Sequence, residues 1–290
     1  MISGIKKIFL KNSDSKGLGR DVILTGIPRS GTTLSCKILL GVKNQIALNE
    51  PIAGELFSKG MPPLSVIQQC FSKYRKSLIK KGIAPARTKK GKITDNAFSR
   101  EETKREFVLK RTKVHFKKPL SDDFTLIFKH CSEFTLILED LQKDYECFAL
   151  VRNPLAILAS WNTVNVAVSR GKVAKSQIFK PQFHRQIEEI GSLFEKQLYI
   201  LNWYFRQYED LAPENIIKYE KLVSSQGEVL SVISGKETLS SDPLYNQNQN
   251  SIYDRKVLSQ YLDLLRNSEG AFSPYYSIEE IEELAQKMGV

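Results

Sequence analysis

The segment from Asp21 to Leu40 limits the possible folds of this chain more than any other. Residues 21–26 (DVILTG) are typical of a short buried strand, and residues 32–40 (TTLSCKILL) of a helix that Gly41 closes. A turn rich in Gly, Pro and Ser joins the two. A strand, a glycine-containing loop and a helix in this order predict an anion site, because loop N–H groups and the positive end of the helix dipole point toward the same place.

The loop reads GIPRSGTT from Gly26 to Thr33 and differs from an ATP-binding loop. The two glycines leave the backbone free of side chains, and the threonines add hydroxyl donors. In the ATP motif GxxxxGK[ST] a lysine follows the last glycine, whereas here the cation lies inside the loop as Arg29. We therefore expect a phosphate site of another kind, with the binding residues Pro28, Arg29, Ser30, Gly31, Thr32 and Thr33.

The rest of the chain alternates strand-like and helix-like segments. Further strands are expected at residues 45–48, 125–129, 147–151 and 216–219, and helices at 64–81, 133–141, from 154 onward, 183–208, 254–266 and 278–288. This alternation predicts an α/β fold with a central, mostly parallel five-stranded sheet flanked by helices. A length of 290 residues fits a single domain spanning 1–290.

Positive charge is concentrated in one segment. Residues 73–118 hold 17 Lys or Arg and four Asp or Glu, a charge of +13, while the whole chain carries +11. We interpret residues 83–123 as a basic, irregular insertion with short helical pieces around 100–109. It is either a solvated loop or an electropositive rim that attracts an anionic ligand. Nucleic acid is not an expected partner, because aromatic residues are not closely interleaved with the basic ones.

Composition also bears on location and metals. No apolar run approaches the roughly 18 residues of a membrane helix, and residues 1–10 are too short and too rich in lysine for a signal peptide. We expect a soluble, cytoplasmic protein without a membrane span. The chain has only three histidines, so no metal site is expected. The sequence does not indicate an oligomeric state.

Three segments together resemble the PAPS-dependent sulfotransferases, where PAPS is 3′-phosphoadenosine 5′-phosphosulfate. GIPRSGTTL resembles their 5′-phosphosulfate loop, and VRNPLAILASW (residues 151–161) their 3′-phosphate motif. In that motif an arginine and a serine eight residues later hold the 3′-phosphate, and Arg152 and Ser160 have this spacing. IIKYEKL (residues 216–222) resembles a third element, which places Tyr219 beside the adenine. The resemblance covers roughly residues 20–45 and 125–225.

The chain departs from the cytosolic aryl and steroid members of that family. It lacks their C-terminal RKGxxGDWK-type segment, for which Arg255 and Lys256 are a candidate substitute or else an exposed pair. The stretch from Arg29 to Arg152 is also longer, because the basic segment intervenes. The resemblance is therefore nearer to the bacterial and the carbohydrate- or tyrosyl-protein-type branches.

The resemblance implies in-line transfer of a sulfuryl group from PAPS, without a metal, to a hydroxyl or an amine or amide nitrogen. PAP is then the other product, and the acceptor is a small molecule, with natural-product sulfation in secondary metabolism as the expected setting. Arg29 would serve the reacting phosphosulfate. Lys129, at the end of a strand, is expected to be a cation at the transition state or, alternatively, part of a structural ion pair.

Two residues are candidates for the catalytic base. Glu50 follows a strand in LNEP, where several branches of the family place a glutamate, although Pro51 also suits a helix start that attracts a carboxylate. His130 follows Lys129 directly, one position away from the K-x-H spacing of the cytosolic members. We favour Glu50, whose ordinary pKa of about 4.3 would have to be raised by burial.

Two other functions stay open from the sequence. One is a P-loop kinase or NTPase, which Thr32 and Arg152 disfavour because they stand where a lysine and a metal ligand are expected. The other is a non-catalytic binder of nucleic acid or another polyanion through residues 73–118, for which steep salt dependence of binding is expected.

Overall fold

Strand β1 (Asp21–Gly26) lies in the middle of the computed structural model and faces two separate cores. Val22 and Leu24 belong to one apolar cluster and Ile23 to the other, and none of the three is exposed. A strand covered on both faces must be apolar at nearly every position, which explains the sequence VILT. The structure describes residues 19–58, 60–99, 105–268 and 270–290.

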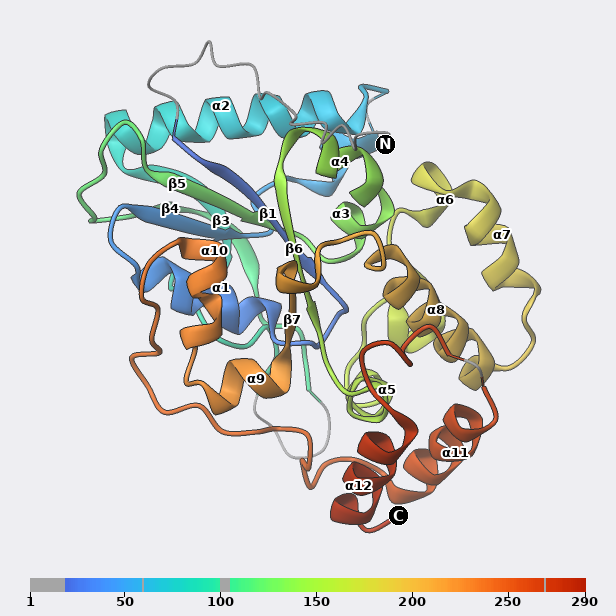
Figure 1. The fold of residues 1–290 in the computed structure, drawn as a ribbon. Coiled ribbons are helices and arrows are strands. Elements are labelled where there is room, and N and C mark those ends of the chain that lie inside the picture. Colours follow the sequence, from blue (N-terminus) through green and yellow to red (C-terminus); the bar gives the residue numbers. More distant parts are fainter. Residues whose placement is uncertain (1–18, 59, 100–104, 269) are drawn as a thin grey trace, which may run out of the picture.

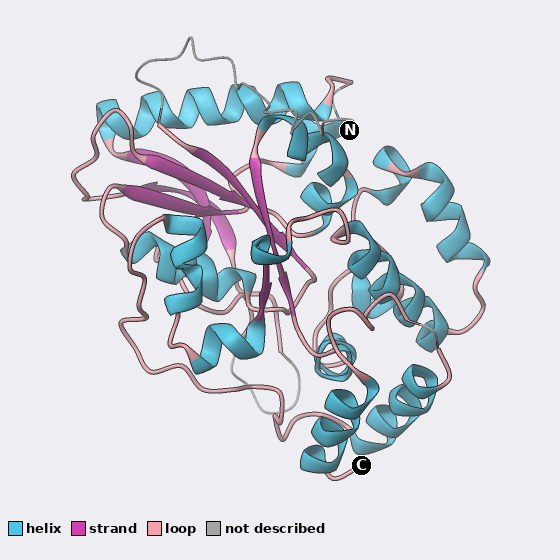
Figure 2. Ribbon diagram, viewed as in Figure 1, coloured by secondary structure: helices cyan, strands magenta, loops and turns pink. Residues whose placement is uncertain are grey.

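The central sheet has five strands in the order β2-β5-β1-β6-β7, and each neighbouring pair is parallel (Figure 2). The expected α/β fold is therefore confirmed. The other four strands are β2 (Gln45–Asn49), β5 (Thr125–Lys129), β6 (Glu146–Val151) and β7 (Ile216–Lys218). Because all five strands run the same way, their carboxyl ends meet at one edge of the sheet.

Helices cover both faces of the sheet (Figure 1). One face packs against α1 (Thr32–Gly41), α9 (Tyr219–Ser224) and α10 (Ser231–Ser234). The larger core on the other face contains residues of α2 (Pro63–Lys81), α3 (Ser132–Leu136), α4 (Leu138–Asp144), α5 (Pro154–Trp161), α7 (Pro181–Glu189), α8 (Leu193–Gln207), α11 (Arg255–Arg266) and α12 (Ile278–Met288). A short helix, α6 (Ser176–Phe179), precedes α7.

Two expected helices are each divided in the structure. The helix expected at 133–141 is split into α3 and α4 at Ile137, whose φ of −124° and ψ of 22° leave the helical range. The stretch 183–208 is split into α7 and α8. Gly191 and Ser192 lie between the two, where a glycine weakens the helix and a serine suits the start of the next.

The basic segment contains a two-stranded antiparallel hairpin that the sequence analysis did not predict. Strands β3 (Ile83–Thr88) and β4 (Lys110–His115) pair along their whole length. In β3 the buried residues are Ala84, Ala86 and Thr88, and these small side chains give only a weak alternating pattern. The helical pieces expected at 100–109 are wrong for residues 105–109, which form no helix, while 100–104 lie outside the described residues.

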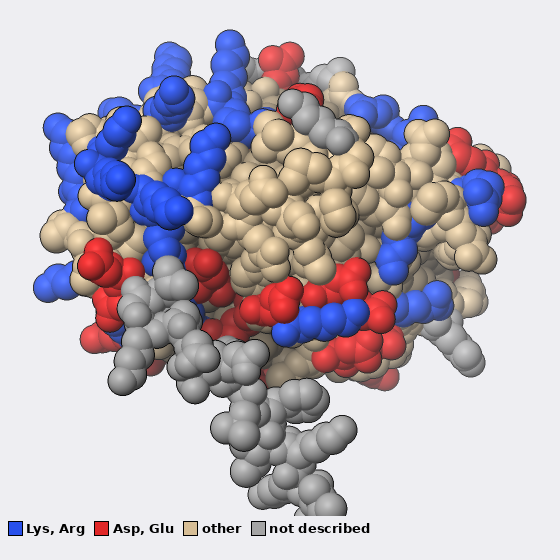
Figure 3. Space-filling view, turned by 90° about the horizontal axis from the view of Figure 1, so that it is seen from above, with Lys and Arg blue, Asp and Glu red and all other residues tan. Residues whose placement is uncertain are grey.

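The surface of this region is rich in lysine. Figure 3 views the molecule from above Figure 1, the side on which α2 lies, and shows Lys and Arg gathered at one end. Within residues 19–58, 60–99, 105–268 and 270–290, no helix is long and apolar enough to span a membrane. The expectation of no signal peptide concerned residues 1–10, which lie outside the described part of the chain.

Gly26 ends β1 where the chains of two strands approach closely. A Cβ atom at this position would lie 2.6 Å from the Leu150 carbonyl oxygen, and the φ of Gly26 is 153°. We predict that Gly26→Ala lowers the free energy of unfolding by about 2 kcal/mol or more. Urea denaturation measures this, with Gly60→Ala as a control at a positive-φ glycine that has open space around it. Equal effects of the two substitutions would contradict the close-approach explanation.

Candidate active site

A cavity of about 1140 Å³ lies at the carboxyl edge of the sheet, and a residue after each of the five strands lines it. These residues are Arg29 after β1, Glu50 after β2, Cys131 after β5, Arg152 after β6 and Tyr219 after β7. The parallel topology thus gathers side chains from distant parts of the sequence. Such an edge is where open α/β sheets bind ligands.

The loop after β1 forms a tight turn followed directly by α1. Ser30 N–H donates to the Ile27 carbonyl at 3.0 Å, and Arg29 adopts a φ of 77°, which few residues other than glycine favour. Gly31 has a φ of 93°, and a Cβ there would lie 2.9 Å from the Tyr219 ring. Among the described side chains, none caps the first turn of α1. The amides at this helix start therefore face the cavity edge without a side-chain partner.

Arg29 extends along one wall of the cavity. Its Nε donates to Ser160 Oγ at 3.0 Å, its Nη1 to Asn96 Oδ1 at 3.4 Å, and its guanidinium lies 4.5 Å from the centre of the Phe98 ring. Burial lowers the pKa of Arg29 to about 10, and the neighbouring Arg152 adds to this effect. The side chain is therefore still a cation at neutral pH.

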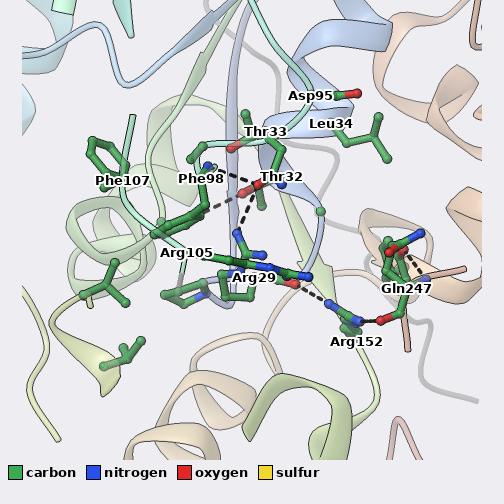
Figure 4. Close-up of a pocket in the computed structure, with 18 of the residues that line it drawn as sticks. Arg29, Thr32, Thr33, Leu34, Asp95, Phe98, Arg105, Phe107, Arg152 and Gln247 are labelled. Atoms are coloured by element: carbon green, nitrogen blue, oxygen red, sulfur yellow. Dashed lines mark hydrogen bonds between the residues drawn. The ribbon is translucent and has the colours of Figure 1, made fainter. Parts of the chain in front are cut away.

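Arg152 lies against the same loop and is 4% exposed. Its guanidinium donates to the Arg29 carbonyl at 3.0 Å and the Gln247 carbonyl at 2.8 Å (Figure 4), and to Asn248 Oδ1 at 2.7 Å. It also lies 4.5 Å from the centre of the Tyr219 ring. Within the described part of the chain, no carboxylate forms an ion pair with Arg29 or Arg152. Arg152 and Ser160, the expected pair, are linked through Arg29: Arg152 donates to the Arg29 carbonyl, and Arg29 Nε donates to Ser160 Oγ.

Glu50 and Lys129 meet at the end of the neighbouring strands. Lys129 Nζ lies 3.3 Å from Glu50 Oε1, and Arg87 of β3 forms an ion pair with Glu50 Oε2. Burial alone would raise the pKa of Glu50, but the charges of Lys129, His130 and Arg87 outweigh it and lower the pKa to about 2. This is opposite to the upward shift that the sequence analysis required of a base. Burial alone would lower the pKa of Lys129, yet Cys131 and Glu50 raise it.

His130 lies behind the cavity wall. It is 2% exposed and does not line the cavity, and its Nε2 accepts a hydrogen bond from the Ile52 N–H at 3.3 Å. Its Nδ1 faces Glu133 Oε2 at 3.6 Å. Of the two candidates for the base, the geometry favours Glu50, since Glu50 lines the cavity.

The structure places Arg255 and Lys256 outside the cavity, contrary to their suggested phosphate role. Both are exposed at the start of α11, and Arg255 lies against Gly289. Two residues earlier, Tyr253 lines the cavity, and Arg152 Nη2 lies 3.4 Å from its hydroxyl oxygen. Burial would raise the pKa of Tyr253, but Arg152 and Arg29 lower it. Tyr253 is a site residue that the sequence analysis missed.

The basic segment supplies more residues that the sequence analysis missed. Arg87, Phe98, Arg105 and Phe107 line the cavity, as does Glu133 of α3. The Arg105 Nε is buried and has no hydrogen-bond partner among the described residues. The only available signal was the density of arginine in the segment, which does not say which side chains face inward. Across the described ranges, no three His, Cys, Asp or Glu side chains form a group that could hold a metal ion.

No protein-family model and no curated protein matches the chain. Among solved structures, the sulfotransferase domain from the curacin biosynthetic pathway is 14% identical, with a TM-score of 0.40, and covers 95% of this chain and 99% of that one. A sulfotransferase from Alicyclobacillus acidocaldarius is 12% identical, with a TM-score of 0.41 and coverages of 93% and 97%. The sulfotransferase STF9 from Mycobacterium avium is 13% identical, with a TM-score of 0.34 and coverages of 94% and 76%.

These neighbours are sulfotransferases, the family that the three sequence motifs resemble. Because their TM-scores are below 0.5, this likeness assigns no function to the chain.

The lowered pKa of Glu50 predicts how stability depends on pH. Its pKa is about 2 when folded against an ordinary 4.5, so its contribution is present above pH 4.5 and is lost as pH falls toward 2. We expect Glu50→Gln to cost up to about 3 kcal/mol of unfolding free energy at pH 7 and about 1 kcal/mol at pH 3. Urea denaturation at both pH values measures it. An equal cost at pH 3 and pH 7 would show that the ion pairs do not act as described.

Proposed function

We propose that the chain transfers a sulfuryl group from PAPS to a hydroxyl, or to an amine or amide nitrogen, of a small acceptor. The observation that carries this proposal is the arrangement of Arg29 and Arg152 beside the loop. Both are cations in a cavity, and their hydrogen-bond partners are neutral oxygens of Ser160, Asn96, Asn248, Tyr253 and two backbone carbonyls. An anion would replace these by charged, stronger acceptors, so the site suits a ligand with several phosphate-like groups.

The residues present fit PAPS, which supplies an activated sulfuryl group when bound. The loop from Pro28 to Thr33, including Ser30, would hold the 5′-phosphosulfate, since no described side chain caps the amides at the start of α1. Arg152 and Ser160 would hold the 3′-phosphate, and Tyr219 would lie beside the adenine. Arg152 stands at the end of β6, where a kinase of this topology would be expected to place an acidic metal ligand.

The other side of the cavity suits proton abstraction and charge stabilisation. Glu50 lines the cavity between Lys129 and Arg87, so it is ionised at neutral pH and can accept a proton from the acceptor. Lys129 is 3% exposed and contacts Cys131, whose Sγ lies 3.4 Å from Thr32 Oγ1 of the loop. Its positive charge would therefore lie near the negative charge that develops during transfer. An anion that engages Lys129 weakens its hold on Glu50 and so raises the pKa of that carboxyl.

The acceptor would lie against the remaining wall. Phe107, Val166, Val168 and Ala174 line the cavity there and offer apolar contact to a small molecule. This supports a small metabolite as acceptor. We propose natural-product sulfation in the cytoplasm as the setting of this reaction.

The donor site is tested first, by calorimetric titration with PAP in the absence of magnesium. We expect micromolar binding by the wild type and a loss of about tenfold or more in Arg152→Ala, because a buried cation that contacts a phosphate contributes at least one charged hydrogen bond. Arg185→Ala, at an exposed position on α7, is the matched control and should bind PAP normally. A folded wild type that ignores PAP and binds ATP with magnesium would instead support a kinase.

The base is tested by turnover. We predict that Glu50→Gln lowers kcat by roughly 10²-fold or more, the scale of general-base loss, while PAP affinity stays within about threefold. Glu139→Gln, an exposed carboxylate on α4, is the control. PAPS consumption is followed with whichever acceptor of a hydroxyl and amine panel the wild type sulfates. Activity of Glu50→Gln within a few-fold of the wild type would exclude Glu50 as the base.

A further inference from the structure

Two arginines and two phenylalanines form a continuous row across the cavity. Arg29 lies over Phe98 with its guanidinium carbon 4.5 Å from the ring centre, and Phe98 meets Phe107 edge to face at 5.6 Å. Arg87 in turn lies 5.2 Å from the centre of the Phe107 ring and forms an ion pair with Glu50. The row therefore connects the loop after β1 to the carboxylate after β2.

A short antiparallel contact fixes the two rings relative to each other. Phe98 and Phe107 form an isolated β-bridge, beside which Ser99 N–H donates to the Glu106 carbonyl at 2.8 Å and Val108 N–H to the Ala97 carbonyl at 3.0 Å. We call the segment that carries these residues, 83–99 and 105–115, the arm. Its backbone holds the rings in place independently of the cations.

The arm also holds the backbone of Glu50. Arg111, which pairs with Arg87 across the hairpin, donates from Nη2 to the Ile52 carbonyl at 2.7 Å and from Nε to the Glu50 carbonyl at 3.3 Å. Glu50 has a φ of 46°, in the left-handed region that side-chain-bearing residues rarely adopt. Such a conformation persists only where the surroundings stabilise it.

The ion pair between Arg87 and Glu50 lies at the edge of solvent. The two side chains are 30% and 26% exposed, although Arg87 Nε itself is buried, so holding Arg87 in the pair costs side-chain entropy. A ring face beneath the guanidinium restricts Arg87 and adds a cation–π attraction. Phe107 is 43% exposed, so burying the ring in a core does not explain its presence at this position.

We propose that Phe98 and Phe107 are positioning residues: Phe98 holds the Arg29 guanidinium in the cavity wall, and Phe107 holds Arg87 against Glu50. The proposal rests on the proposed function for the roles of Arg29 and Glu50. The row itself is a property of this chain's arm and does not depend on the identity of the acceptor.

Solution NMR of protein with ¹⁵N-labelled arginine tests the row without any ligand. The Arg87 Nε–H signal is identified by its loss in Arg87→Lys, and its hydrogen-exchange rate reports how firmly the guanidinium is held. We expect Phe107→Ala to speed this exchange by about threefold or more, the scale of one cation–π contact, and Phe107→Tyr to stay within about twofold of the wild type. Phe98→Ala should speed exchange at the Arg29 Nε–H in the same way.

Matched variants separate ring contact from bulk. Phe107→Leu keeps an apolar side chain without a ring and should behave like Phe107→Ala, with an otherwise unchanged amide spectrum as the proof of folding. Ile178→Ala, half exposed on α6, should change neither arginine. The proposal is overturned if both Phe98→Ala and Phe107→Ala exchange at the wild-type rate, or if Phe107→Leu exchanges as slowly as Phe107→Tyr.

Calorimetry with PAP links the row to the donor. Phe98→Ala should weaken PAP binding about threefold or more, and Phe107→Ala should leave it within about twofold, because only Phe98 contacts Arg29. Equal affinities in the wild type and Phe98→Ala overturn the donor half. If the wild type binds no PAP, the proposed function fails, while the exchange rates at Arg87 still decide whether the row exists.

Discussion

The placement of two positive side chains, Arg29 and Arg152, at the turn after β1 is the constraint on which the rest of the site depends. Arg152 is close enough to lower the pKa of Arg29, and no described carboxylate forms an ion pair with either arginine. Burying two like charges costs free energy: burial lowers the pKa of Arg29, whereas Tyr253, Tyr219 and Glu220 outweigh burial and raise the pKa of Arg152. Arg152 also stabilises the loop, because it donates a hydrogen bond to the Arg29 carbonyl and so links the loop to the end of β6. An anion in the cavity relieves the remaining repulsion.

The opposite side of the cavity follows a different electrostatic rule. Glu50 has two cations in contact, Lys129 and Arg87, so its own charge is more than balanced. The cavity thus has one side lined by two arginines and another side where a carboxylate is stabilised, and the two sides lie at different strands between β2 and β6. Since Lys129 lies between them, its charge is shared between Glu50 and any anion at the loop. Under the proposed function, the pKa of Glu50 would therefore depend on whether the donor is bound.

The parts of the site that follow strands could be predicted from the sequence, and the parts that come from long-range packing could not. The apolar runs of the five strands can be recognised in the sequence, and parallel strands bring their carboxyl ends to one edge. Lys129 ends one of these strands, and the residues that follow the others are Arg29, Glu50, Arg152 and Tyr219. Only the resemblance placed Ser160 near Arg152, and the hydrogen bond from Arg29 to Ser160 was not predicted.

Other contacts left no local signal. Tyr253 and Arg152 belong to segments about a hundred residues apart, so their contact could not be predicted from local sequence. The hairpin depends on the small residues Ala84 and Ala86, and no periodic pattern in the sequence predicts that they are buried. The position of Arg87 beside Glu50 follows from that hairpin, so it could not be predicted from the sequence either.

The basic segment shows why net charge alone does not locate a site, whereas the type of cation does. Among its described residues, the arginines at 87, 105 and 111 line the cavity or bond to the backbone around Glu50, while the exposed cations are lysines, at positions 73, 76, 80, 81, 89, 90, 92, 110, 113 and 117. Arg75 and Lys118 do not line the cavity and donate to backbone carbonyls elsewhere. A planar guanidinium can stack on a ring and bond in fixed directions, as Arg87 and Arg111 do, whereas an ammonium is more strongly hydrated and stays in water. The lysines fit a solvated surface, and the arginines make the same segment a wall of the cavity.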